Sequence, residues 1–325
     1  MTLVVVPLNL FSSKLSKLRT LLVVLMLVAL LPLITGITLL FSHMLREQDR
    51  HVRTTAIIQA RTIMAVIDRE FMRTHAVLKT LANQGLGDDQ NLADFHSRAG
   101  MSARDLGAST VVLLKSNGKM VLSTKRPYGT TLPLFSNAPL LERTFTTGLP
   151  GVSSLFVSPI DRQFIYALSV PIRIDGEVVY SLSAIYTPDA LNEILRSQRL
   201  PAGWRAAIID DQGRIVTRTH EAAHFTGRTV LPKLKDQLHS NSEGAFDDIT
   251  LDGILVMTAF SKSPLCHWNV VIGIPLEESA KPTRAYILQV VIVFGATLLV
   301  GAAIIWWLMD YLTKLIAVKS RDTET

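Results

Sequence analysis

Hydrophobic residues are concentrated in two long runs near the ends of the chain. Residues 20–42 and residues 286–309 contain no charged side chain, whereas the sequence between them mixes apolar and polar positions. About 20 apolar residues in a helix are enough to cross the hydrocarbon core of a bilayer. The pattern therefore predicts two transmembrane helices, at 20–43 and 285–309, on either side of a folded central segment.

Charge at the flanks of the first run sets the expected orientation. Lys14, Lys17 and Arg19 precede this run, and residues 1–19 contain no acidic side chain. Positive residues are retained on the cytoplasmic side of a membrane helix. We therefore expect residues 1–19 and the short tail at 310–325 in the cytoplasm, and the central segment outside.

From residue 44 to about residue 90 the apolar positions follow the period of a helix. Neither Gly nor Pro interrupts residues 44–84, and GLGDDQN at 85–91 supplies a stop. We expect one long helix that continues out of the first span. Because its apolar stripe is longer than one module needs, we also expect an exposed part that joins two chains in a parallel homodimer. The stripe is formed by Val52, Ala56, Ala60, Ile63, Ile67, Phe71, Thr74, Leu78 and Leu81.

An internal repeat follows the helix. VVLLKSNGKMVLST at 111–124 matches AAIIDDQGRIVTRT at 206–219, at a constant offset of 95 residues. Each copy reads as a β-hairpin with glycine in its turn, and each is followed by two more apolar strands. The strands are FIYALSVPIRI and VVYSLSAIY in the first copy, and ILVMTAFSKS and WNVVIGIPL in the second. The repeat predicts an α+β fold with two tandem antiparallel-sheet modules, the first module at 91–198 and the second module at 199–284.

The loop after the second hairpin spells a zinc-protease motif. HEAAH at 220–224 fits H-E-x-x-H, in which two histidines one helical turn apart bind zinc and the glutamate polarises water. The matching stretch of the first copy, KRPYG at 125–129, contains neither residue type, and Val230 stands where the longer motif needs a third ligand. We therefore expect a loop without a catalytic metal or cofactor. His220 and His224 remain a weak alternative metal site, and a membrane metalloprotease is the alternative function.

Composition and charge narrow the classes of function that remain. The net charge of +6 forms no basic stripe in the sequence, so nothing indicates binding to nucleic acid. Cys266 is the only cysteine, which excludes a disulfide within the chain, and we expect it to behave as a small buried hydrophobic residue.

Five phrases within residues 105–280 together resemble a known receptor family. They are TKRPYGTTLP, DGEVVYSLSAIYTPDAL, RLPAGWRAAIIDDQGRIVTRT, ITLDGILVMTAFSKSPL and WNVVIGIPLEE. The set is similar to the double Cache region, two tandem PAS-like modules, of bacterial transmembrane sensor histidine kinases, particularly those with HWE-type kinase domains. The resemblance implies a two-pass receptor of the bacterial inner membrane whose periplasmic segment senses a small molecule.

The family's kinase domain has no counterpart in the tail at 310–325, which contains neither histidine nor glycine. We therefore expect the chain as given to be non-catalytic. A truncated histidine kinase and a receptor that acts on a separate cytoplasmic or membrane kinase are both left open.

The resemblance also implies that the ligand lies in the first, membrane-distal module, between the sheet and its covering loops. An arginine fork suits a carboxylate or phosphate, so an anionic ligand fits the candidate set. The competing explanation is that tyrosines on amphipathic strands are core residues and loop arginines are solvated. The candidates are Arg126 and Tyr128 after the hairpin, Arg162 and Tyr166 at the next strand, and Tyr180 and Tyr186 at the last strand.

Overall fold

The structure is a computed structural model that describes residues 9–85, 92–135, 137–276, 288–289, 291–304, 306–307, 310, 311 and 314. Within the first helix, the side chains of residues 9–31, 33, 34 and 37 are not described. The chain divides into two compact units, one formed by residues 1–51 with 279–325 and the other by residues 52–278.

Helix α1 (Asn9–Asn83) runs for 75 residues and contains Pro32. The expected long helix is thereby confirmed, and it ends just before the glycine-containing segment. In the part of the chain that the structure describes, no helix combines the length and the apolar character needed to cross a membrane. The runs interpreted as spans, at 20–42 and 286–309, lie partly outside the described residues.

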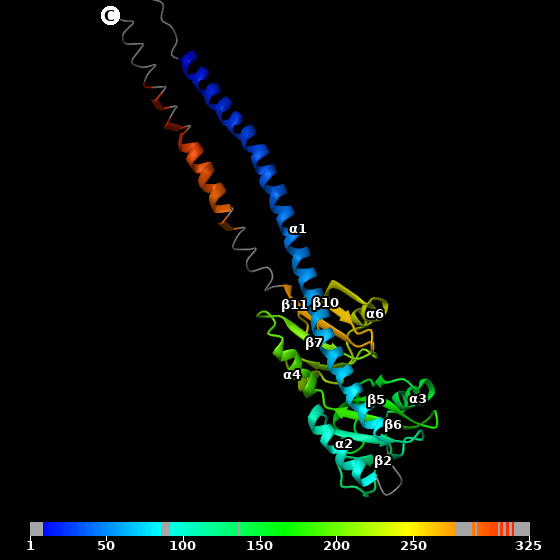
Figure 1. Cartoon of the computed structure of the whole chain (residues 1–325). Helices are drawn as coiled ribbons and strands as arrows, with labels where there is room; N and C mark the ends of the chain where they lie inside the picture. The colour runs from blue at the N-terminus through cyan, green and yellow to red at the C-terminus, as the bar shows by residue number, and fades with distance from the viewer. Residues whose placement is uncertain are drawn as a thin grey trace, which may run out of the picture. The chain divides into compact units, whose positions relative to one another are not determined.

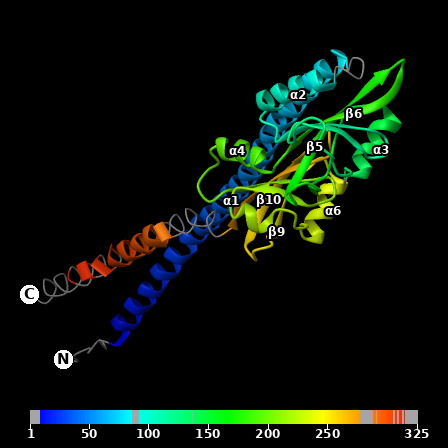
Figure 2. The same ribbon diagram turned by 90° about the horizontal axis from the view of Figure 1, so that it is seen from below.

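The first module contains α2 (Leu92–Leu106), α3 (Ala138–Thr147) and a sheet in which the strands follow the order β2-β1-β6-β5-β3, with β4 paired to β5. Its strands are β1 (Thr110–Leu114), β2 (Met120–Ser123), β3 (Gly151–Val152), β4 (Phe156–Val157), β5 (Phe164–Ile174) and β6 (Glu177–Tyr186). Helix α2 lies beside the C-terminal end of α1 in both views (Figure 1, Figure 2). Arg98 of α2 donates to Gln84 and so ties the two helices together.

The second module has a sheet with the order β8-β7-β11-β10-β9. Its elements are α4 (Asp189–Ser197), β7 (Arg205–Ile209), β8 (Ile215–Arg218), α5 (Ala222–Phe225), α6 (Pro232–Ser240), β9 (Glu243–Ile249), β10 (Leu255–Lys262) and β11 (Asn269–Pro275). Helix α4 covers the β7–β8 hairpin, because Asn192 is buried and donates to Thr217 and to the carbonyl of Arg218. Helix α4 therefore follows the last strand of the first module and packs on the second.

The internal repeat is present in the backbone pairing as well as in the sequence. The register of β1 with β2 shifts between Leu113 and Leu114, and that of β7 with β8 shifts between Ile208 and Ile209, again 95 residues apart. Isolated bridges join Lys119 to Leu134 and Arg214 to Thr229 at the same offset. The loops after the two hairpins thus have equal length. Gly129 of the first loop and Gly227 of the second are 98 residues apart, so they do not occupy equivalent positions in the repeat.

Both sheets pack against the apolar stripe of α1. Val52 is half-buried and the other eight stripe residues are buried. The apolar ones share a cluster with Leu113 and Leu168 from the first module and Ile208 and Ile272 from the second. The expectation that part of this stripe stays exposed as a dimer seam is therefore wrong. One helix serves two sheets, and together they use the whole stripe.

Strand β9 was not expected, because the sequence around Glu243 reads as a polar turn. It lies at the edge of the second sheet, where a strand needs a partner on one side only, and most of its residues keep some exposure. Arg53 and Arg61 of α1 form ion pairs with Asp247 and Glu243, so this edge is held to the helix by charge. Strand β9 can therefore form without a regular alternation of apolar and polar residues.

Candidate functional site

Each sheet has one face on α1 and an opposite, outer face covered by loops and short helices. In the first module the outer face forms its own apolar cluster, which includes Val112, Phe135, Ile165 and Ile185. A cleft of about 30 Å³ lies over this face, beneath the loop that precedes β5. We call it the first cleft. Since one water needs roughly 10–15 Å³ by this measure, the first cleft is nearly closed in this structure.

An ion pair bounds the first cleft. Lys125, directly after the hairpin, binds Asp161 in the loop between β4 and β5. Hydrogen bonding to Lys125, and secondly to the Ser158 hydroxyl, lowers the pKa of the Asp161 carboxyl to about 2. The carboxylate is therefore ionised throughout the neutral range, and the cleft presents one positive and one negative group.

Three predicted site residues lie in the loops that carry this ion pair. Arg126 and Tyr128 follow Lys125 and are exposed, and the backbone carbonyl of Arg126 lies 3.0 Å from the Nε2 atom of His96. Arg162 follows Asp161, is exposed, and has a φ of 61°, in the left-handed region. None of the three lines the first cleft itself. Lys125 and Asp161, which do line it, were missed because neither stands out until the fold brings them together.

The tyrosines lie elsewhere. Tyr166 and Tyr186 are buried on the face that packs against α1, with their rings stacked 5.4 Å apart between centroids. The hydroxyl of Tyr186 lies 3.0 Å from that of Thr74 on α1. Burial raises the pKa of both tyrosines. Tyr180 is partly buried and packs against the same core, so the structure brings the three tyrosines to the helix side of the sheet and away from the first cleft.

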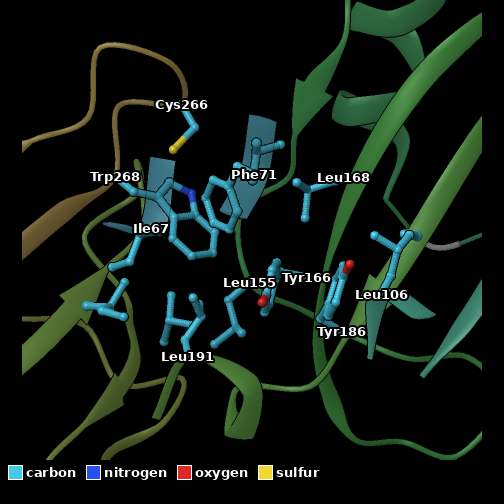
Figure 3. Packing of buried hydrophobic residues seen from close by; sticks show 14 of the residues in the cluster. Ile67, Phe71, Leu106, Leu155, Tyr166, Leu168, Tyr186, Leu191, Cys266 and Trp268 are labelled. Atoms are coloured by element: carbon cyan, nitrogen blue, oxygen red, sulfur yellow. The ribbon is translucent and has the colours of Figure 1, made fainter. Parts of the chain in front are cut away.

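The two modules meet in a buried aromatic junction, drawn in Figure 3. The Trp268 ring stands edge-on to Phe71 of α1 at 5.6 Å and to Tyr166 of the first module at 5.4 Å. Trp268 has no exposed surface, and Leu155 of the first module is buried in the same cluster. Cys266 lies beside it, where burial raises the thiol pKa to about 12. The expectation of a small buried cysteine is confirmed.

Polar contacts reinforce this junction at one corner. The backbone amide of Leu155 donates to Asp210 at 3.0 Å, and the Ser154 hydroxyl donates to Asp211 at 2.6 Å. Asp210 also accepts from the amides of Gln212 and Arg214 in its own turn. Burial raises the pKa of Asp210 despite these bonds. The first module is thus held to the β7–β8 turn of the second.

The HEAAH loop does not form the helix that a zinc protease needs. Helix α5 is a single turn, Ala222–Phe225, and Glu221 before it is left-handed with a φ of 47°. His220 therefore lies outside the helix, and the two histidines are not one turn apart on a common face. Among the described residues there is no group of three or more His, Cys, Asp or Glu side chains placed to hold a metal ion. The geometry gives the metalloprotease alternative no support.

A larger cleft lies over the outer face of the second sheet. We call it the second cleft; its volume is about 90 Å³, and β7, β8, β10, β11 and α6 contribute to its lining. Most of its lining is aliphatic, with Arg205 and Arg218 at the end of the hairpin. Sequence reasoning did not find it, because the residues that create it are small rather than chemically distinctive.

No family model matches the sequence, and no curated protein does. Solved structures do match. The extracellular domain of rpHK1S-Z16, a protein assigned as a histidine kinase, is 15% identical with a TM-score of 0.58, covering 68% of this chain and 93% of that one. Methyl-accepting Chemotaxis protein X is 13% identical with a TM-score of 0.57, covering 70% of this chain and 98% of that one.

The ligand-binding domain of the Campylobacter jejuni chemoreceptor Tlp3, solved in complex with L-valine, is a third such structure. It is 14% identical with a TM-score of 0.51, covering 71% of this chain and 96% of that one. At these identities the likeness concerns the fold. The central segment of this chain has the fold of the extracytoplasmic sensory domains of histidine kinases and chemoreceptors.

Proposed function

We propose that the chain is a non-catalytic transmembrane receptor that senses a small extracytoplasmic molecule through a double Cache region. The observation that carries this proposal is the single core shared by both modules and α1, with Trp268 at their junction. A ligand that favours one packing of the first module shifts the whole arrangement by its differential affinity for the two states. Helix α1 would carry that shift toward the membrane.

The first cleft is the proposed ligand site. Lys125 and Asp161 neutralise each other here, and a zwitterion would offer a carboxylate to the one and an ammonium to the other. A related fold, that of Tlp3, was solved with L-valine, which is such a molecule. Arg126 and Arg162 lie next to the pair and would add attraction for an anionic group. We propose an amino acid or a comparable small charged metabolite as the ligand, and the nearly closed first cleft would widen to admit it as the Lys125–Asp161 ion pair opens.

Screening the purified full chain against the amino acids and small organic acids tests this site. A ligand at 100 times its Kd stabilises the folded state by about 2.7 kcal/mol and should raise the melting temperature. Asp161→Asn should weaken the response at least tenfold, because it removes a charge-assisted contact. Asp175→Asn, at an exposed turn, is the matched control and should bind as the parent does. An unchanged response in Asp161→Asn would refute the assignment.

Two membrane spans, at 20–43 and 285–309, are proposed from the apolar runs, with the central segment in the periplasm. A reporter that is active only in the periplasm should be active when fused after Gln198 and silent when fused after Thr325. The reverse pattern would contradict both the orientation and the receptor proposal. We further propose that output comes from a histidine kinase, on a separate chain or beyond residue 325.

A parallel homodimer remains part of the proposal, on the outer face of α1 instead of its buried stripe. Ile58 and Met72 are 51% and 52% exposed and lie fourteen residues apart, with exposed Ala65 midway. Residues seven apart share one face in a coiled coil. In a Cys266→Ser background, single cysteines at Ala65 and Met72 should form disulfide-linked dimers upon oxidation, while one at buried Ala60 should not. Cross-linking at Ala60 alone would exclude this interface.

A further inference from the structure

The first and second clefts occupy equivalent places in the repeat. Val112 of β1 and Ala207 of β7 correspond at the offset of 95 residues, as do Phe135 and Val230 beyond the hairpin. The strand pairing supplies another equivalence, since Ile185 lies opposite Thr110 in the first sheet and Gly273 lies opposite Arg205 in the second. All of these residues line their respective clefts.

Side-chain size explains why the second cleft is larger. At equivalent positions, the second module has Ala207 where the first has Val112, Val230 where the first has Phe135, and Gly273 where the first has Ile185. Two other residues that line the second cleft, Thr258 and Val271, are larger than their counterparts Ala167 and Ser183. The loss of the whole Ile185 side chain outweighs these additions. The space above the second sheet is about 90 Å³, against about 30 Å³ above the first.

The polar groups of the second cleft carry an excess positive charge. The guanidinium groups of Arg205 and Arg218 share a single carboxylate, Asp252, at 2.8 Å and 3.1 Å. Asp248, which is the acid that lines the cleft, is paired with Lys233 at 3.7 Å. Arg218 is held in place from the far side, with its guanidinium carbon 4.1 Å from the centre of the Phe225 ring. One positive charge of the cluster is therefore not balanced by an acid within it.

We propose that the second cleft is a separate binding site for a short-chain aliphatic carboxylate. Its aliphatic tail would lie over Ala207 and Gly273, and its carboxylate would bind the Arg205 and Arg218 guanidinium groups, which suit it geometrically. The cleft is smaller than the cavity of about 150 Å³ that accommodates benzene, so a chain of a few carbons fits. This site goes beyond the proposed function and does not depend on occupation of the first cleft.

Calorimetric titration of the purified full chain with sodium acetate, propionate, butyrate and hexanoate tests the inference. Propionate or butyrate should bind most tightly, and butyramide, which is neutral but similar in shape, should bind at least tenfold more weakly. Arg205→Gln should weaken butyrate about tenfold and leave the preference for chain length unchanged. Arg205 suits this test because its side chain is partly exposed and Arg218 remains to pair with Asp252.

Filling the cleft provides the second test. Ala207→Val introduces the residue of the first module, and Gly273→Ala adds a methyl group whose nearest neighbour is a Val256 side-chain atom at 3.7 Å, so the backbone need not move. Each variant should melt near the parent and bind butyrate at least tenfold more weakly. Undiminished binding in both variants, equal binding of butyramide, or no binding of any carboxylate would overturn the proposal. Butyrate binding lost in Asp161→Asn but kept in Ala207→Val would place the ligand in the first cleft and also overturn it.

Discussion

Replacing Trp268 by alanine should lower the free energy of unfolding of the central segment by about 3–5 kcal/mol, the range for a large aromatic deleted from a core. The side chain has no exposed surface, and it contacts Phe71 of α1 and Tyr166 of β5 with its ring edge-on to both. The cavity would open where the helix and both modules meet. Because α1 and the two modules share this core, we expect the variant to unfold in one cooperative transition, at a lower denaturant concentration than the parent.

Urea unfolding of the full chain, followed by far-ultraviolet circular dichroism, measures this effect. Trp204→Ala is the matched control, because Trp204 belongs to the second module but is only half-buried and lies outside the aromatic junction. Trp204→Ala should lower the free energy of unfolding clearly less than Trp268→Ala does. Equal losses in the two variants would mean that the junction contributes nothing beyond ordinary burial of a tryptophan.

Much of the fold was predictable because the signals are local. A glycine in each turn, apolar runs on both sides and a threonine at the end of each hairpin recur 95 residues apart, and the hydrogen bonds from the amides of Val111 and Ala206 to Thr124 and Thr219 repeat with them. The helical period from Val52 to Leu81 was also readable. The packing of two sheets against this one stripe was not predictable, because the number of sheets that share a helix is a property of the tertiary structure.

The candidate site was less predictable, for a physical reason. The alternation in β5 shows that Tyr166 and Ile165 point to opposite faces, but not which face the helix covers. Tyr166 was taken as a ligand contact and lies on the helix side, where it packs against Phe71. Lys125 and Asp161 are 36 residues apart and carry no pattern in sequence. Only the folded chain joins them.

Gly227 provides the second large effect. Its φ is 84°, and a Cβ atom added there would lie 2.4 Å from the Cζ atom of Phe164, in the first module. An alanine in the left-handed region costs about 1–2 kcal/mol by itself. The ring of Phe164 must also leave its place, since three of its atoms lie within 2.9 Å of that Cβ position. We therefore expect Gly227→Ala to cost about 2–4 kcal/mol in unfolding free energy.

A matched glycine separates the two contributions. Gly253 has a φ of 77° and open space around its Cβ position, so Gly253→Ala should show the backbone cost alone. In a Phe164→Ala background, Gly227→Ala should cost no more than Gly253→Ala, because the obstructing ring is gone. Urea unfolding of the four variants gives this coupling directly. If Gly227→Ala costs as much with alanine at 164 as with phenylalanine, the HEAAH loop does not press on the first module. If the coupling is present, that loop has a structural role, since Gly227 allows its backbone to pass close to Phe164 and brings the second module against the base of β5.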